Sequence, residues 1–565
     1  MQMMVIGARI ILAPIRKHGG KTMNTVVNII KFTDRFLRKY RFRIGIYLLC
    51  GAALFGTGVI EPFIIGKFID SLSGGIDIHM TIKFAVLILV ISVLELLLSY
   101  YVKIEGTRMS MRTSSKIKGD IFMHMQKISP LKMPNEEIAT LSKRINNDSE
   151  YLMIYLLNLG MQFPGQLIGF VVTLFYMFIY SKPVFMIVLI MIPLLWLFHK
   201  KNKDEIYEKA SEEEASHSRF FAVMHEQLEK LNTVRDNAIF ELMHNRFEKA
   251  YILSEKTSMA YEKKSFGYKL ISRNADIILK AILFGFGTYS IIKNDMTIGV
   301  FTVLYSYLGM VSGYITYFLE VGQETCKYKV YYDRLKDLCE IREEHIGKEE
   351  IAGIEKIEVK DLTFGYKDEK KILKNFNYTL NRGKVYCIKG DNGTGKSTLM
   401  KNILGLYVDE SGNNILYNDK PINELDLYDL RSNKFGVCEQ EPDMLNDTIR
   451  GNILQDEKDF DLNRFKEICH GLSLFTDITD IKEFEGKLNE DADTLSGGQK
   501  QKLVLARVFY KNPEVIVMDE PTSALDKVGI SSLIAYLKRI KKDKIIFMIS
   551  HDQSLIEAAD EIVAV

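Results

Sequence analysis

Cysteine and net charge are both low in this chain of 565 residues. The formal net charge of +2 gives no support to nucleic-acid binding, which a strongly basic chain favours. We find no internal repeat and no low-complexity tract. The six cysteines form no CxxC pair and fall mostly on segments expected in the cytosol, so neither a zinc site nor a disulfide framework is indicated: Cys50, Cys326, Cys339, Cys387, Cys438 and Cys469.

Long apolar stretches dominate the first 300 or so residues, and the 47% hydrophobic composition suits a membrane domain plus a soluble domain of about 200 residues. A helix needs about 20 mainly apolar residues to cross the hydrocarbon core of a bilayer. Six candidate spans follow, of which the fourth and fifth are short: 44–66, 84–102, 161–180, 183–198, 277–292 and 298–319.

Lysine and arginine indicate the orientation of these spans. The segment before the first span holds ten of them against one acidic residue, Asp34, whereas the loop 71–82 holds none. Both termini are therefore expected in the cytoplasm of a bacterial cell, with the chain in the cytoplasmic membrane. The connections 103–161 and 199–276 are charged and helix-patterned, so the spans should continue into the cytosol as long helical extensions.

The segment GDNGTGKS, at 390–397, follows a strand-like run and precedes a helix-like run. Its glycines allow backbone N–H groups to turn around a phosphate, and the helix start adds positive potential. Lys396 is placed to reach the terminal phosphates of a nucleotide, and the Ser397 hydroxyl to ligate Mg²⁺. The predicted phosphate contacts are Gly390, Asp391, Asn392, Gly393, Thr394, Gly395, Lys396, Ser397 and Thr398.

An apolar run at 515–518 ends in Asp519 and Glu520, at the carboxyl end of a presumed buried parallel strand. Asp519 can hold the Mg²⁺ shell. Glu520 is then free to polarise a water molecule against the γ-phosphate, as phosphoryl transfer requires. The alternative is a pair of acids that cap a strand, which the phosphate loop upstream disfavours.

LSGGQ at 495–499, followed by KQKLVLAR and MDEPTSALD, resembles the nucleotide-binding domain of an ATP-binding cassette (ABC) transporter. The resemblance implies a head-to-tail dimer closed by ATP, because in this family the signature contacts the γ-phosphate held by the opposite subunit. The signature residues here are Ser496, Gly497, Gly498 and Gln499. A serine and two glycines at a helix start also form an anion-binding nest.

Other positions match the family one at a time. Tyr366 resembles the aromatic residue that stacks on adenine, and we favour this over an ordinary strand aromatic. Gln440 resembles the loop glutamine that touches Mg²⁺, and His551 the switch histidine that contacts the γ-phosphate. Asp526, in the run SALD, resembles the loop that crosses the dimer interface. Glu490 lies where exporters carry a Glu thought to sense the membrane domain, although its flanking residues depart from that motif.

The resemblance to an exporter-type (type IV) half-transporter covers nearly the whole chain. We expect a membrane α-helical bundle of six transmembrane helices with long cytosolic extensions, followed by an α/β P-loop ATPase domain. The expected divisions are an N-terminal extension 1–30, a transmembrane domain 31–340, a linker 341–355 and a nucleotide-binding domain 356–565. The segment 141–152 resembles the one that follows the first coupling helix, and the second coupling helix is expected at 231–240.

The last span carries polar and small residues on one face of its helix: Thr302, Ser306, Gly309, Gly313, Thr316 and Glu320. Two interpretations remain open, a stripe that lines a transport cavity and close helix packing through the GxxxG pair Gly309 and Gly313. Charges within spans are costly, so Glu95, deepest in the second span, is the charged candidate for substrate contact. Asp276 and Lys280, four residues apart, should pair with each other.

The resulting expectation is an ATPase that exports an amphiphilic drug, a lipid or a small peptide by alternating access, with ATP and Mg²⁺ as cofactors. One chain supplies one cassette, so the partner is a second copy or a homologous half-transporter. The alternatives of the same architecture are an ATP-gated channel, a regulatory sensor and a siderophore importer. Intact hydrolytic residues argue against a pure regulator.

Both termini carry an expectation of their own. The segment 1–22 lacks a signal-peptide layout, and we hypothesise that it is not translated, because Gly19 and Gly20, encoded GGAGGN just before Met23, resemble a ribosome-binding site. The intact mass of protein expressed from its native gene tests this, and a mass beginning at Met1 contradicts it. The chain ends at Val565, soon after the strand before His551, where relatives usually add a further strand and helices. We therefore expect no such additions.

Overall fold

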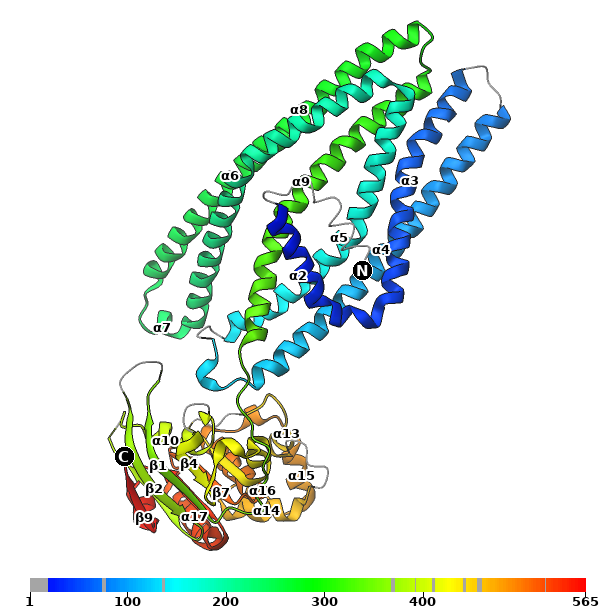
Figure 1. The fold of residues 1–565 in the computed structure, drawn as a ribbon. Coiled ribbons are helices and arrows are strands. Elements are labelled where there is room, and N and C mark those ends of the chain that lie inside the picture. The colour runs from blue at the N-terminus through cyan, green and yellow to red at the C-terminus, as the bar shows by residue number, and fades with distance from the viewer. Residues whose placement is uncertain are drawn as a thin grey trace. The chain divides into compact units, whose positions relative to one another are not determined.

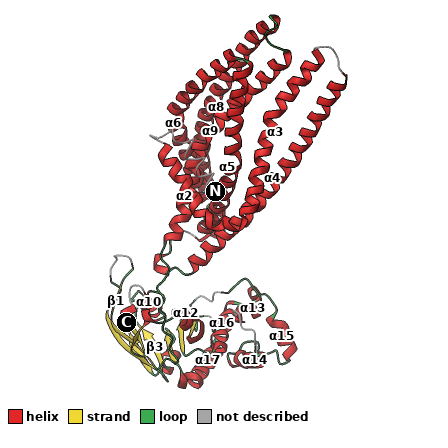
Figure 2. Cartoon of the chain, turned by 45° about the vertical axis from the view of Figure 1, so that its right-hand side comes forward, coloured by secondary structure: helices red, strands yellow, loops and turns green. Residues whose placement is uncertain are grey.

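The computed structural model describes residues 19–565 apart from 74–77, 135–137, 367–370, 392, 409–411, 441–443, 455–459 and 524. The predictions for Asn392 and Ala524 therefore lie outside the described residues. The chain forms two compact units, a helical unit of Met1–Phe122 with Glu136–Glu340 and an α/β unit of Met123–Asn135 with Ile341–Val565. Figure 2 shows that the strands lie in the α/β unit, and none of the described residues of the helical unit forms a strand.

The helical unit is built from long helices that run side by side (Figure 1). The helices α6 and α8 form an antiparallel hairpin joined by the short α7, while α3, α5 and α9 pack together. In order, its elements are α2 (Gly19–Leu37), η2 (Arg38–Tyr40), α3 (Arg41–Ser73), α4 (Ile78–Gln126, whose last turn belongs to the other unit), α5 (Ile138–Tyr180), α6 (Lys182–Glu229), α7 (Leu231–Asp236), α8 (Phe240–Ile292) and α9 (Ile298–Glu340).

All six predicted spans fall within six of these helices, α3, α4, α5, α6, α8 and α9, which extend well beyond the apolar stretches. Among the described residues, four helices are long and apolar enough to cross a membrane by length and composition, and these contain the first, second, third and sixth predicted spans. Among the described residues, the apolar part of α6 is Lys182–Leu194.

The helices α3 and α9 cross in direct contact at Gly66 and Gly299. A Cβ atom on Gly299 would lie 2.1 Å from the carbonyl oxygen of Gly66, so only glycine fits at this position. Beside the crossing, Asp70 of α3 accepts hydrogen bonds from the Gly299 N–H at 2.8 Å and from the Thr297 hydroxyl at 2.9 Å. The carboxylate thereby provides a hydrogen-bond acceptor at the start of α9, where the backbone N–H groups have no partner within the helix.

The GxxxG interpretation of the last span is wrong within this chain. A Cβ atom on Gly313 would meet no atom within 4 Å, and one on Gly309 would meet only Lys280 Nζ, at 3.9 Å. The close helix contact involves the more distant pair Gly66 and Gly299 instead. Small residues at a spacing of four permit close packing, but the partner helix and the depth of the crossing decide where it occurs.

We predict that Gly299→Ala destabilises the helical unit, because the added methyl forces α3 and α9 apart. Overpacking of this kind costs about 1–3 kcal/mol. Thermal melting of the purified protein in detergent should show a lower midpoint. The matched control is Gly313→Ala, which adds a methyl to the same helix in open space and should leave the midpoint unchanged or slightly higher. Equal midpoints for the two variants would contradict the prediction.

The α/β unit contains a parallel sheet of five strands in the order β6-β7-β8-β3-β9. The strands β3, β6, β7 and β8 are continuous apolar runs with nearly every residue buried, as expected for parallel strands covered on both faces. Their bounds are β3 (Val385–Lys389), β6 (Phe435–Cys438), β7 (Val515–Asp519), β8 (Ile545–Ile549) and β9 (Glu561–Ala564).

A second, antiparallel sheet has the order β2-β1-β4-β5. It consists of β1 (Lys356–Phe364), β2 (Leu373–Asn381), β4 (Ile415–Tyr417) and β5 (Lys420–Pro421). The helical elements of this unit are η3 (Pro130–Lys132), α10 (Lys396–Ile403), η4 (Gly412–Asn414), η5 (Ile422–Glu424), α12 (Leu427–Asp429), η6 (Leu430–Lys434), α13 (Ile449–Leu454), α14 (Leu462–Gly471), α15 (Ile481–Leu488), η7 (Ala492–Thr494), α16 (Gly497–Lys511), α17 (Lys527–Ile540), η8 (Lys541–Asp543) and α18 (Gln553–Ala558).

The expectation that no further strand or helix follows the strand before His551 is wrong. The helix α18 and the strand β9 both follow it, and β9 pairs in parallel with β3 through Ile562 and Val563. The strand is four residues long and only Val563 is buried, so its sequence carries little of the apolar signal that marks the other four.

The segment between α4 and α5 is part of the α/β unit and is hydrogen-bonded within it. The Glu344 N–H donates to the Lys127 carbonyl at 2.9 Å, and the Ser129 hydroxyl donates to the Leu406 carbonyl at 3.3 Å. Leu131, in η3, packs against the core of the unit. This short helix precedes the segment 141–152, and so lies where the resemblance placed the first coupling helix.

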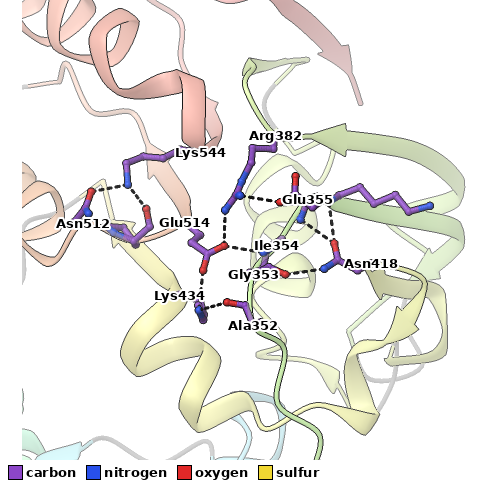
Figure 3. Close-up of polar contacts among 12 residues, drawn as sticks. Ala352, Gly353, Ile354, Glu355, Arg382, Asn418, Lys434, Asn512, Glu514 and Lys544 are labelled. Atoms are coloured by element: carbon purple, nitrogen blue, oxygen red, sulfur yellow. Dashed lines mark hydrogen bonds and ion pairs between the residues drawn. The ribbon is translucent and has the colours of Figure 1, made fainter.

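The linker before β1 is held by the carboxylate of Glu514, which directly precedes β7 (Figure 3). Glu514 accepts hydrogen bonds from Arg382 at 2.7 Å, from Lys434 at 2.7 Å and from the Ile354 N–H at 2.7 Å. Lys434 also donates to the Ala352 carbonyl at 2.8 Å. Burial opposes ionisation of Glu514, but the Lys434 and Ile354 hydrogen bonds and the two positive charges outweigh it, so the pKa of this carboxyl lies below its usual value.

We predict that Glu514→Gln lowers the melting midpoint of the α/β unit, because an amide cannot accept all three bonds and brings its own N–H groups toward two cations. A loss of about 2 kcal/mol is expected for hydrogen bonds to a charged group, or roughly 4–8 °C for a domain of this size. A carboxyl with a depressed pKa stabilises the fold fully above its unfolded pKa of about 4.3 and loses that effect only as pH falls through the lower folded value. The deficit of the variant should therefore be the same at pH 6 and pH 8.

The control for this prediction is Glu355→Gln, which removes one exposed ion pair with the same arginine, Arg382. Surface pairs contribute at most about 1 kcal/mol, so this variant should melt close to wild type. A deficit for Glu514→Gln that is no larger than that of Glu355→Gln would contradict a central role for Glu514.

Candidate nucleotide-binding site

The phosphate loop lies between β3 and α10, and its backbone requires glycine. Gly393 and Gly395 adopt φ angles of +85° and +104°, in the left-handed region. A Cβ atom on Gly395 would also lie 2.9 Å from the Leu373 side chain. The Lys396 ammonium folds back over the loop and donates to the carbonyls of Gly390 at 2.9 Å and Asp391 at 3.0 Å. The loop is thus preformed around the lysine that is predicted to reach the phosphates.

Two predicted Mg²⁺ ligands lie in contact with each other. The Ser397 hydroxyl donates to the Asp519 carboxylate at 3.0 Å, which joins the start of α10 to the end of β7. Burial and the neighbouring Glu520 charge raise the pKa of Asp519, and the Ser397 hydrogen bond acts in the opposite direction. A hydroxyl and a single carboxylate fit Mg²⁺, which is usually bound by one or two carboxylates together with substrate phosphates.

Glu520 follows Asp519 and points into the same site. Its Oε2 atom accepts a hydrogen bond from Gln440 at 3.0 Å, and its Oε1 atom lies 3.8 Å from Nε2 of His551. Parallel strands bring these side chains together, because β6, β7 and β8 are neighbours and the three residues follow their carboxyl ends. The backbone of Glu520 has a φ angle of +45°, a strained conformation for a residue with a side chain.

The signature residues lie at the start of α16, where Ser496 and Gln499 form a reciprocal capping box. Ser496, Gly497 and Gln499 are exposed. Within the described residues, no hydrogen bond joins the signature to the loop 390–397. The start of α16 is therefore exposed to solvent.

The remaining predicted residues have partners of their own. The Tyr366 hydroxyl lies 3.1 Å from the Thr398 hydroxyl and 3.3 Å from that of Tyr407, so the ring is near the start of α10, and stacking on adenine stays a prediction. Asp526 caps α17 by accepting from the Gly529 N–H at 2.9 Å. Glu490 pairs with Lys487 at 2.5 Å.

One buried residue at the site was missed by sequence reasoning. Gln501, in the helix that starts with the signature, donates to the Glu520 carbonyl and to the Ser523 hydroxyl. Its position two residues after LSGGQ was the only available signal, and a lone glutamine on a helix carries little information.

The membrane candidates make local contacts of their own. Asp276 and Lys280 form the expected pair at 2.8 Å, and the Lys280 ammonium also lies 5.1 Å from the centre of the Tyr305 ring. The hydroxyls of Thr302 and Ser306 donate to carbonyls of their own helix. In the described part of the chain, no hydrogen bond or ion pair joins Glu95 or Glu320 to the other candidates. Their role in substrate contact stays a prediction.

Comparison with known families assigns both units. The sequence model of the family described as "ABC transporter" matches residues 373–523, and that of the "ABC transporter transmembrane region" matches residues 44–315. The chain belongs to the ABC transporter family. One membrane region and one ATP-binding region in a single chain make it a half-transporter, and the family's activity is ATP hydrolysis coupled to transport.

Relatives of this ABC protein match it over almost its full length. A putative multidrug export ATP-binding/permease protein of Staphylococcus aureus is 24% identical over 95% of both chains. The corresponding protein YgaD of Bacillus subtilis is 23% identical over 95% of this chain and 94% of its own. A solved bacterial Atm1-family ABC exporter with ATP bound has a TM-score of 0.80 at 18% identity and covers 94% of each chain. The fold is therefore that of an ABC exporter.

Proposed function

We propose that two copies of this chain export an amphiphilic substrate across the bacterial cytoplasmic membrane by ATP-driven alternating access. The observation that carries this proposal is the division of the ATP site: the hydrolytic residues converge on one sheet edge, while the signature of the same chain is exposed and, among the described residues, has no hydrogen bond to the phosphate loop. Two copies packed head to tail supply each site with both parts. Two relatives are named as putative multidrug export proteins, which supports export and a drug-like amphiphile as substrate.

In each site, the phosphate loop and Lys396 bind the nucleotide phosphates, and Tyr366 stacks on the adenine. Ser397, Asp519 and Gln440 would hold Mg²⁺, which neutralises charge on the β- and γ-phosphates. Glu520 orients the attacking water and accepts its proton. His551 reaches the γ-phosphate from the end of β8. Ser496, Gly497 and Gly498 of the second copy direct N–H groups and a helix start at the same phosphate.

The experiment that tests this proposal is ATP-dependent uptake of fluorescent amphiphiles into inside-out vesicles that contain the purified chain. The proposal expects uptake by wild type and none by Glu520→Gln, together with ATPase stimulation by the transported compounds. An ionic current that appears on ATP binding and survives Glu520→Gln would instead identify a gated channel. Uptake only into right-side-out vesicles would identify an importer.

A further inference from the structure

Gln501 occupies a position between two parts of the ATP site. It lies one turn into α16, only 1% exposed, and its amide nitrogen donates to the Glu520 carbonyl at 3.2 Å and to the Ser523 hydroxyl at 3.0 Å. The Ser523 N–H donates to the same Glu520 carbonyl at 3.2 Å. One buried side chain therefore ties the turn 520–523 to the helix that carries the signature.

The turn that Gln501 holds determines the direction of the Glu520 carboxylate. With φ at +45°, the Glu520 backbone is in a region that persists only where surrounding contacts impose it. Its N–H donates to the Ile549 carbonyl at 2.9 Å, and its carbonyl accepts from Gln501 and Ser523. Both sides of the strained residue are thus fixed, one by β8 and the other by α16.

We propose that Gln501 is a positioning residue that couples the orientation of the Glu520 carboxylate to the position of α16. The inference rests on the proposed function, in which the start of α16 engages the nucleotide held by the second copy. A shift of α16 on that engagement is transmitted through Gln501 to the backbone of Glu520 in the chain's own site. Occupancy of one site therefore sets the geometry for hydrolysis in the other.

The first test compares homodimers. Gln501→Met keeps the length of the side chain and removes both hydrogen bonds. Because a displacement of about 1 Å at a reacting centre can cost as much as ~10²-fold in rate, we expect kcat for ATP to fall at least about tenfold while KM changes less than about twofold. The cooperativity of hydrolysis with ATP concentration should decrease. Ser523→Ala, which leaves the bond to the Glu520 carbonyl, should show a smaller loss.

The matched control is Tyr510→Phe near the far end of the same helix, where the hydroxyl accepts a hydrogen bond from the Asp461 N–H at 2.8 Å. It removes a buried contact of α16 without touching the turn 520–523. Its kcat should stay within about twofold of wild type. A comparable fall in kcat for Tyr510→Phe would mean that any loosening of α16 has this effect, and would overturn the inference.

Mixed dimers separate positioning of Glu520 from distortion of the signature. Two differently tagged chains are co-expressed, one with Glu520→Gln, so that only the other chain has an active Glu520. In the cis arrangement, Gln501→Met is on the chain with the intact Glu520. In the trans arrangement it is on the Glu520→Gln chain, whose signature faces the active site. Single-turnover release of phosphate is measured against the mixed dimer without Gln501→Met.

The inference expects a loss of at least about tenfold in cis and a rate within about twofold of the reference in trans. Loss in trans without loss in cis would show that Gln501 acts through the shape of the signature, and equal loss in both arrangements would show a general loosening of the dimer instead of positioning of Glu520. Either result overturns the inference. Failure of the proposed function is distinguishable, because it appears as wild-type protein that does not hydrolyse ATP or as two chains that do not co-purify, and the inference then falls with it.

Discussion

Glu520→Gln is expected to reduce ATP hydrolysis at least ~10²-fold while leaving the affinity for ATP unchanged. The amide fills the same space and keeps an oxygen that can bind Gln440, which donates to the carboxylate at 3.0 Å. It cannot accept a proton from the attacking water. None of the residues predicted to bind the phosphates is altered, because the Lys396 and Ser397 contacts do not involve the Glu520 side chain.

The measurement is phosphate release by purified protein in lipid nanodiscs, with nucleotide affinity determined separately at equilibrium. Glu557→Gln serves as the control, because this glutamate is on α18 and bonds only with Gln553 among the described residues. It should hydrolyse ATP at the wild-type rate. If Glu520→Gln retained more than about a tenth of wild-type turnover, another group would have to act as the base and the assignment of Glu520 would fail.

The site was predictable from the sequence where its residues follow apolar strands. The runs that become β3, β7 and β8 are nearly all buried, and each ends at a motif, so Lys396 and Asp519 could be predicted from local pattern and His551 from the family resemblance. The parallel sheet then brings the ends of these strands together, because its order places β7 beside β8 and β8 beside β3. The same short stretches of sequence therefore indicate both the buried strands and the functional residues that follow them.

Contacts between distant segments could not be predicted in this way. The crossing of Gly66 with Gly299, the packing of Leu131 against the core of the α/β unit and the hydrogen bonds of Glu514 each join segments with no shared local pattern. The GxxxG interpretation of the last span, one of the two left open, does not hold within this chain for the same reason, since it rested on spacing within one helix without knowledge of the neighbouring helix. Gln501 was missed because its function depends on which turn it meets after folding.

Lys396→Ala is expected to lower the affinity for ATP by about ten- to a hundredfold. Charge-assisted hydrogen bonds contribute about 1.5–3 kcal/mol, and each 1.4 kcal/mol is a factor of ten in the dissociation constant. Lys396 is nearly buried, 9% exposed, and its ammonium donates to the Gly390 and Asp391 carbonyls, so its removal also loosens the loop. Lys396→Arg should not restore the affinity for ATP, because the planar guanidinium of arginine does not replace the compact ammonium of lysine in a glycine-lined loop.

Equilibrium titration with ATP and Mg²⁺ distinguishes this variant from Glu520→Gln, since the first loses binding and the second loses only turnover. Lys538→Ala, on an exposed position of α17, removes the same charge elsewhere and should bind ATP as wild type does. An affinity of Lys396→Ala within about twofold of wild type would mean that the loop backbone alone holds the phosphates. Lys396→Ala and Glu520→Gln together therefore separate nucleotide binding, which depends on the start of α10, from nucleotide hydrolysis, which depends on the end of β7.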